Sequence, residues 1–264
     1  MGNDTGVGEA ERCWFAPSWG VLWRSKLVLA AILVVLGVFG SSPAYGFPPY
    51  RSTDAETADP WTMEARLGLL RLERDGHRNE YSSPLLRLNT GFPHNLELVS
   101  EFENRADEGE VADVALGFKW IPFMRALSVG MENLALLPVT PERHDPGVES
   151  TLLATQRLGA LRIHVNGGGF YDPRPGEDEV GWKSGMIVEQ QWGRSRVGVE
   201  VFAKQVRSEP VQVLAGPGII FDVGPFDVRV GVHVGLTEAA PDLAPSLWVT
   251  GRLPLWPDGS YEGK

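Results

Sequence analysis

Side-chain polarity alternates with a period of two along residues 180–205. Even positions from 182 to 192 are mostly apolar, whereas the odd positions between them include a lysine and a glutamate. Beyond a short turn at 193–195 the alternation resumes, with valines at 197, 199 and 201 on one parity and polar residues on the other. Because successive side chains of a strand point to opposite faces, this stretch predicts a hairpin of two strands.

Each arm of this hairpin has about ten residues, the length that a tilted strand needs to cross a bilayer. One face is largely apolar with tryptophans at its ends, and the other carries lysine and glutamate. Ser184 and Gln190 are polar exceptions on the apolar face, and Ile187 and Phe202 are apolar exceptions on the polar face. The dominant pattern is that of a barrel with lipid outside and water inside.

The same alternation recurs along the chain and predicts an all-β fold, an antiparallel transmembrane β-barrel of about 12 strands. The predicted strands span 61–73, 79–89, 95–103, 111–121, 126–137, 149–158, 161–170, 180–192, 196–206, 211–222, 226–236 and 246–256. Connections after the even-numbered strands are short, whereas most of those after odd-numbered strands are longer and acidic. Short periplasmic turns and longer external loops are typical of bacterial outer-membrane barrels.

Two predicted strands mark the extremes of this pattern. The strand at 226–236 alternates apolar residues with Asp227, Arg229 and His233. The strand at 211–222 contains Pro217 near its middle, and proline lacks the amide hydrogen that a ladder hydrogen bond requires. We therefore expect a bulge or a break in strand pairing at this proline.

An apolar run of fourteen residues, 27–40, follows Arg24 and Lys26 and precedes small residues that end at Gly46. A basic flank, a short apolar region and small residues at the cleavage positions are typical of a secretory signal. We expect a signal peptide at 1–46 and a mature protein that begins at Phe47. The alternatives are an uncleaved membrane anchor and a start site placed too early.

The remaining chain divides into an irregular, proline-rich and acidic lead-in at 47–60, the barrel at 61–256 and a C-terminal tail at 257–264. Cys13, the only cysteine, precedes the apolar run, so the mature protein cannot form a disulfide. Acids and bases balance in the signal region, so the mature part keeps the formal net charge of -10. Without a basic patch, this charge argues against nucleic acid as a partner.

Several short stretches carry a family resemblance. They are the lead-in from Pro49 to Ala58, the run from Ser83 to Gly91 continuing into Asn95–Leu98, and Leu136-Leu137-Pro138. These stretches resemble a group of Gram-negative outer-membrane barrels that are often labelled as transporters or as proteins of the MetA pathway of phenol degradation. The resemblance implies passage of small molecules, aromatic or hydrophobic ones among them. It supplies no catalytic residue.

Strand parity places many polar side chains on the inner face of the predicted barrel. The candidates for a solute path are Glu97, Glu101, Glu132, Arg162, His164, Asn166, Lys183, Glu200, Arg229 and His233. The same parity also places Glu64, Arg66, Glu189 and Lys204 inside. Such side chains either form a polar pathway or pair with one another and fill a narrow interior. We favour pairing for most individual residues, with the lumen as a whole as the functional site.

One pair of groups within this set lies on predicted strands that are four strands apart. Glu97 and Glu101 form an acidic group, and Arg162, His164 and Asn166 form a basic and polar group. Long side chains from such positions can approach each other across a narrow bore. We therefore expect these two groups to form the constriction, either as a selective filter or as a permanent salt-bridged plug.

His164 invites an enzymatic interpretation, because lipid-acting barrel enzymes pair a strand histidine with a serine two residues along. Asn166 occupies that position, so the pairing that acyl transfer needs is missing. The histidines at 77, 94 and 144 lie in predicted connections without the spacing of metal ligands. Glycine-rich runs at 166–169 and 216–218 lack the lysine of a phosphate loop. We expect no enzymatic activity, no metal and no cofactor.

These observations predict a porin-like outer-membrane channel or transporter for small molecules, with membrane lipid and the outer-membrane assembly machinery as its partners. Two alternatives stay open: an exported soluble β-barrel or sandwich that binds a hydrophobic ligand, and a lipid-acting barrel enzyme. The soluble alternative requires outward strand faces rich in charge, whereas the membrane barrel requires apolar ones. The direction of the apolar faces therefore separates the first two possibilities.

Overall fold

The structure, a computed structural model, describes residues 49–256 except 77, 106–109, 140–144 and 175–177. The predicted signal peptide at 1–46 and the predicted tail at 257–264 lie outside the described residues. Within the described part of the chain, no helix is long and apolar enough to cross a membrane.

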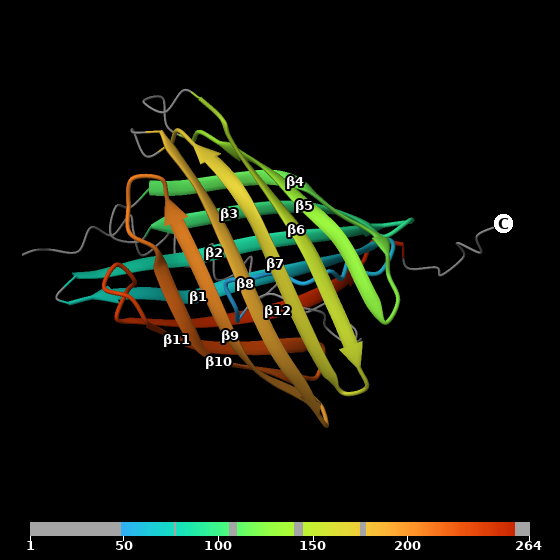
Figure 1. Cartoon of the computed structure of the whole chain (residues 1–264). Coiled ribbons are helices and arrows are strands. Elements are labelled where there is room, and N and C mark those ends of the chain that lie inside the picture. Colours follow the sequence, from blue (N-terminus) through green and yellow to red (C-terminus); the bar gives the residue numbers. More distant parts are fainter. Residues whose placement is uncertain (1–48, 77, 106–109, 140–144, 175–177, 257–264) are drawn as a thin grey trace, which may run out of the picture. The chain divides into compact units, whose positions relative to one another are not determined.

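Antiparallel strands form a closed barrel, in which each strand pairs with its neighbours in sequence and the first pairs with the last (Figure 1). The strands that the structure describes are β1 (Thr62–Asp75), β2 (Arg78–Phe92), β3 (Leu96–Arg105), β4 (Glu110–Phe123), β5 (Leu127–Leu137), β6 (Gly147–Leu158), β7 (Leu161–Asp172), β8 (Glu179–Trp192), β9 (Ser195–Val206), β10 (Gln212–Val223), β11 (Phe226–Gly235) and β12 (Leu243–Pro254). Closure of β1 onto β12 leaves no edge with unpaired backbone groups, as a bilayer requires.

The predicted all-β barrel and its strands are confirmed. Every predicted strand end lies within three residues of the observed one, with the largest differences at the end of β2 and the start of β12. The turns after even-numbered strands are short, and three of them contain glycines in the left-handed region, Gly159 (φ 64°), Gly193 (φ 60°) and Gly224 (φ 63°). Glycine adopts this conformation without the steric penalty that a side chain would bring.

Pro217 interrupts the pairing of β10 on one side only. Pairing with β9 continues through the proline, with Pro217 opposite Val199. Pairing with β11 stops after Ala215 and resumes at Gly218 in the same register. The side chain of Pro217 is exposed on the outer face. A local loss of pairing without a bulge therefore accommodates the missing amide hydrogen.

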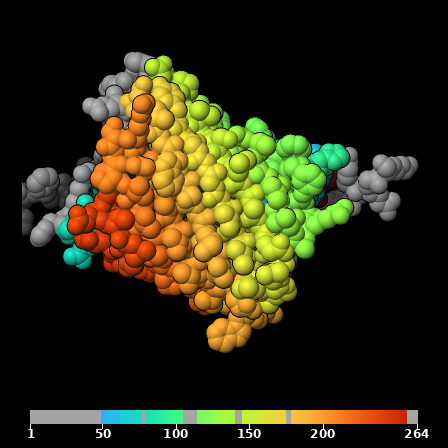
Figure 2. Space-filling model, in the orientation of Figure 1, coloured from blue at the N-terminus to red at the C-terminus, as the bar shows by residue number. Residues whose placement is uncertain are grey.

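The inner and outer faces of the wall have the polarity that the sequence predicts. On β9, Glu200 is fully buried inside, whereas Val199 and Val201 are 54% and 41% exposed outside. Ile187 and Phe202, the apolar exceptions, are buried on the inner side. Figure 2 shows the outer surface of the wall from the green strands near β4 to the orange strands near β10. Large apolar side chains are exposed on most strands, among them Leu152, Met186 and Val234. This is the surface that lipid contact favours.

We expect Val201→Arg to destabilise the folded barrel, because it places a guanidinium on the apolar outer face near the middle of β9. The cost of such a charge at the bilayer midplane is about 2 to 4 kcal/mol. Val201→Leu is the matched control and should change little. Urea unfolding in lipid vesicles measures both variants. Equal free energies of unfolding would show that this face does not contact lipid.

Candidate functional site

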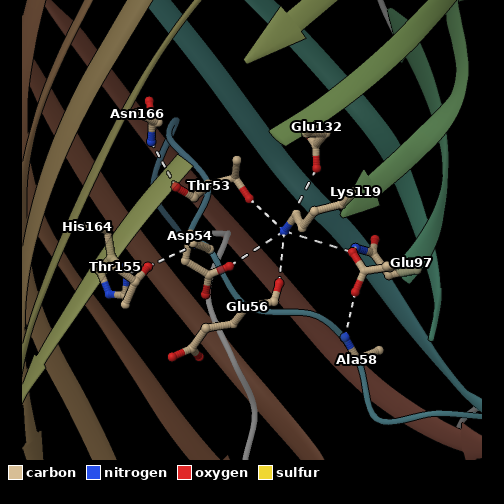
Figure 3. A network of polar contacts seen from close by, with 12 residues as sticks. Thr53, Asp54, Glu56, Ala58, Glu97, Lys119, Glu132, Thr155, His164 and Asn166 are labelled. Carbon is tan, nitrogen blue, oxygen red and sulfur yellow. Dashed lines mark hydrogen bonds and ion pairs between the residues drawn. The ribbon is translucent and has the colours of Figure 1, made fainter. Parts of the chain in front are cut away.

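Residues 49–60, called the lumen segment below, lie inside the barrel. Eight of these residues are buried: Pro49, together with Tyr50, Ser52, Thr53, Asp54, Ala55, Glu56 and Ala58, which are each at most 7% exposed. The segment has no helix or strand, in agreement with the irregular lead-in that the sequence predicts. Its position was not predicted. Figure 3 shows the segment surrounded by side chains that project from the strands.

Side chains of the barrel wall accept hydrogen bonds from backbone amides of the lumen segment. Both carboxylate oxygens of Glu200 are engaged, one by the amide of Arg51 and the other by the amide of Ser52, each at 2.7 Å. Thr155 Oγ1 accepts from the Ala55 amide at 2.9 Å, and Glu97 Oε2 accepts from the Ala58 amide at 2.6 Å. These three wall residues replace the backbone partners that an irregular buried segment lacks.

Other wall side chains donate to the segment. Asn166 Nδ2 donates to the Thr53 carbonyl at 2.8 Å. Lys119 Nζ donates to Thr53 Oγ1 at 3.0 Å and to the Glu56 carbonyl at 3.3 Å, and it lies 3.5 Å from Asp54 Oδ1 (Figure 3). Lys119 is 1% exposed, so its charge is compensated inside the protein rather than by water.

Glu56 binds the segment to the part of the wall near the short turn between β6 and β7. Its Oε1 accepts from Arg157 Nη2 at 2.6 Å, and its Oε2 lies 3.5 Å from Arg162 Nη1. At the other end of the segment, Arg51 Nη2 donates to Glu73 Oε1 at 2.6 Å. Charge-assisted hydrogen bonds of this kind are stronger than those between neutral groups. The segment is therefore bound to the wall through both Arg51 and Glu56.

Inward-facing glycines make room for the segment. A Cβ added to Gly185 would lie 1.7 Å from Ser52 Oγ, and one added to Gly198 would lie 2.4 Å from Tyr50 Oη. A Cβ added to Gly218 would likewise meet Tyr50 and Pro49, one added to Gly231 would meet Pro49, and one added to Gly91 would meet the Ala58 carbonyl. These glycines lie on five different strands. The inner surface of the wall is thus shaped around this segment.

Four of the predicted lumen residues contact the lumen segment directly: Glu97, Arg162, Asn166 and Glu200. His164 and His233 are one contact away. His164 Nδ1 lies 2.9 Å from Thr155 Oγ1, and His233 Nε2 lies 2.7 Å from Glu200 Oε2. These six residues surround the segment, although their role in solute passage stays a prediction.

The other four predicted lumen residues pair within the wall. Glu132 accepts from Arg87 at 2.5 Å, and Glu101 is ion-paired with the same arginine. Lys183 is ion-paired with Glu149, and Arg229 lies 3.0 Å from Asp227. Pairing, which we favoured for most individual residues, is therefore what these positions show.

The two predicted constriction groups are not in direct contact through these side chains, since neither Glu97 nor Glu101 binds His164 or Asn166. Instead, Glu97 binds Ala58, and Asn166 binds Thr53. Members of both groups therefore bind the lumen segment, which lies between them, whereas Glu101 pairs with Arg87 of the wall. The sequence analysis treated the bore as empty and did not place the lead-in inside it, and a constriction formed by these two groups stays a prediction.

His164 has a hydroxyl partner that the sequence did not predict. A serine on the same strand was the expected partner of such a histidine, whereas Thr155 comes from the neighbouring strand β6. Thr155 is fully buried, and its hydroxyl oxygen also accepts from the Ala55 amide. A nucleophile must reach its substrate, so this closed-off pair does not favour acyl transfer.

Lys119 and Arg87 are lumen residues that the sequence analysis did not single out. Lys119 stands on β4 between Phe118 and Trp120, which are 42% and 41% exposed on the outer face. Because alternate residues of a strand face opposite sides, a lysine between two outward aromatic residues could have been predicted to face the lumen. The same prediction was harder for Arg87, because its outward neighbours Leu86 and Leu88 are partly buried.

A cavity of about 340 Å³ adjoins the lumen segment, with Arg51, Ser52 and Thr53 among its lining residues. We call it the vestibule. Its wall comes from the strand halves that lead to the odd-to-even loops and includes Leu85, Leu134, Phe170, Lys183, Lys204 and Trp248. The segment thus separates the vestibule from the end of the barrel where the short turns lie.

No family model and no curated protein sequence matches this chain. Among solved structures, the chain is similar to an outer membrane channel from Pseudomonas putida F1, with a TM-score of 0.59 and 11% identity over 77% of this chain and 100% of that chain. The fold is that of outer-membrane channel barrels. The NanC porin is also similar, with a TM-score of 0.52 and 8% identity over 72% of this chain and 98% of that chain. These similarities support the outer-membrane barrel and do not confirm the resemblance to phenol-degradation barrels.

We expect Glu200→Ala to loosen the lumen segment of this barrel, because the variant removes the acceptor of two consecutive backbone amides. Hydrogen bonds to charged groups contribute about 1.5 to 3 kcal/mol each. Hydrogen–deuterium exchange of the peptide that contains residues 49–60 should therefore accelerate at least tenfold. Glu149→Ala is the control, because Glu149 pairs with Lys183 rather than with the segment. Equal exchange in both variants would contradict the role of Glu200.

Proposed function

We propose that the chain is an outer-membrane channel for small solutes that its own lumen segment closes in this structure. The observation that carries the proposal is a closed barrel with apolar side chains outside and a charged lumen filled by residues 49–60. Since a closed wall offers no open strand edge, the lumen is the route that a solute would take. The similar outer membrane channel and porin support this function.

The contacts of the lumen segment suit a removable closure. The segment is held by hydrogen bonds and ion pairs rather than by pairing as a strand in the sheet. If the segment leaves, water enters and hydrates Glu200, Glu97 and Lys119. The net contribution of such contacts is much smaller than their gross strength, because water replaces the lost partners. Opening therefore costs far less than unfolding the wall.

The outward faces argue against the soluble alternative. Val199, Leu152 and Val148 are 54%, 67% and 53% exposed. A soluble ligand-binding barrel would expose charged residues at such positions and keep a dry apolar interior. Here the interior holds the charges. We also propose that the barrel has no enzymatic activity, since Thr155 and His164 are closed off by the segment.

Export and assembly complete the proposal. The chain is made with a signal peptide at 1–46, is exported, and reaches the outer membrane through the assembly machinery that inserts such barrels. Its solutes are small molecules, with aromatic ones as the class that the family resemblance implies. Mass spectrometry of the exported protein should show Phe47 as the first residue. A product that retains the apolar run at 27–40 would contradict cleavage.

Deleting residues 49–58 should raise the permeability of the reconstituted barrel several-fold, because it removes the material that fills the lumen. Single-channel conductance and liposome swelling measure the change. Gly185→Val tests the same idea without a deletion, since its side chain would occupy the place of Ser52. Gly167→Val is its control, because a Cβ there has only contacts of 3.8 Å or more. Unchanged conductance in folded deletion and Gly185→Val proteins would rule out the segment as the closure.

Arg162→Ala and Glu101→Ala separate the contacts that hold the segment from those within the wall. Arg162 binds Glu56 of the segment, so its loss should increase the frequency of open events. Glu101 pairs with Arg87 of the wall, so its loss should leave that frequency near the parent value. The single-channel recordings above supply the measurement. Equal behaviour of two folded variants would remove Arg162 from the closing mechanism.

A further inference from the structure

Two lysines face each other across neighbouring strands in the vestibule. Lys183 of β8 and Lys204 of β9 are register partners, and both line the cavity. Side chains in such positions start about 4.5 to 5.5 Å apart at Cβ, and like charges placed there are destabilising. One carboxylate, Glu149, pairs with Lys183. The pair therefore brings two positive charges to one side of the vestibule, where one of them has a carboxylate partner.

Lys204 has an aromatic partner rather than an acidic one. Its Nζ lies 5.2 Å from the ring centroid of Phe170, and among the described residues no carboxylate lies within salt-bridge distance. The carboxylates of Glu73 and Asp172 interact electrostatically with Lys204 at longer range, but each has a nearer cation. Arg51 Nη2 lies 2.6 Å from Glu73 Oε1, and Arg174 Nη2 lies 2.7 Å from Asp172 Oδ2. Positive charge is therefore in local excess at Lys204.

The carboxylates that line the vestibule are already engaged. Glu101 and Glu132 pair with Arg87, Glu103 lies 3.2 Å from Arg71, and Glu149 pairs with Lys183. An incoming cation would have to break one of these pairs. An incoming anion would find Lys204 and would reduce the repulsion between the two lysines. The charge arrangement therefore favours an anion, although the whole chain carries a formal net charge of -10.

Apolar side chains complete the cavity. Phe202 and Trp248 line it with Leu85 and Leu134, all pointing inward where parity alone predicts polar residues. Phe202 stands two residues from Lys204 on the inner face of β9. Burying an apolar group against such a wall is favourable by about 25 cal/mol per Å². A volume of about 340 Å³ suits a small organic molecule rather than a single ion.

We propose that the vestibule is a binding site for a small organic acid, with its anionic group between Lys183 and Lys204 and its apolar body against Phe202 and Trp248. This inference rests on the proposed function, since the vestibule is the chamber that a solute would occupy before the lumen segment moves. Affinity comes from both parts of the ligand. A short acid without an apolar body and an apolar molecule without a charge each use half of the site.

Isothermal titration of the detergent-extracted full-length exported protein tests the site without any need for passage. Cyclohexanecarboxylate should bind at least tenfold more tightly than cyclohexanecarboxamide, acetate, inorganic phosphate or protonated cyclohexylamine. These probes vary the charge and the apolar body separately. Equal binding of the acid, the amide and the amine would overturn the proposal, because it would show partition into apolar surface or detergent alone.

Lys204→Gln should weaken binding of cyclohexanecarboxylate at least tenfold and leave binding of the amide unchanged. Lys204→Arg should keep most of the affinity, which guards against a folding defect in the first variant. Arg194→Gln is the matched control, because it removes a cation in the turn between β8 and β9 at the opposite end of the barrel. Unchanged affinity in folded Lys204→Gln protein would overturn the assignment.

Uptake into liposomes distinguishes this proposal from the channel proposal. Acid-selective binding that depends on Lys204, without uptake in the protein that lacks residues 49–58, would support the site and contradict the channel. Uptake in that protein with no preference for the acid in titration would support the channel and contradict the site. Each proposal can therefore fail alone.

Discussion

Side chains alternate between the two faces of a strand, so the register that sets the lipid-facing surface of this barrel also sets the surface of its lumen. Glu200 can point into the lumen only because Val199 and Val201 point out, and a shift of one residue in register would exchange the two environments. Closure of β1 onto β12 gives every strand a partner on both sides, which opposes such a shift. The apolar outer surface and the polar interior are therefore two results of one constraint.

Charges inside such a wall need partners, because burial of an uncompensated charge is costly. Lys119 illustrates how the chain meets this need. Its Nζ lies 3.5 Å from Asp54 of the lumen segment and 3.9 Å and 3.8 Å from Glu97 and Glu132 of the wall. Acids from the segment and acids from the wall thus share one cation. The segment is part of the charge balance of the barrel rather than a passive filling.

The strands were predictable because period-two alternation repeats along residues 61–256 and because short turns join the strands in pairs. The position of the lumen segment was not, since its contacts with Glu200 and Thr155 use backbone amides, which leave no side-chain pattern. A partial signal existed in glycines such as Gly185 and Gly198, which interrupt the inner face of their strands. Lys204 was correctly placed on the inner face, but only the register with Lys183 reveals their pairing. Cross-strand neighbours, including Thr155 beside His164, depend on register and are hidden in a single sequence.

The lumen segment continues directly into the wall at its C-terminal end. Trp61, at the joint, has a φ of 62°, and its amide donates to the Gly91 carbonyl at 2.8 Å. Because of this covalent attachment, the lumen segment cannot diffuse away when it leaves the lumen. Its return is an intramolecular event, governed by an effective concentration on the order of millimolar for a short flexible tether. Reclosing should then follow first-order kinetics, with a rate independent of how many copies of the protein the membrane contains.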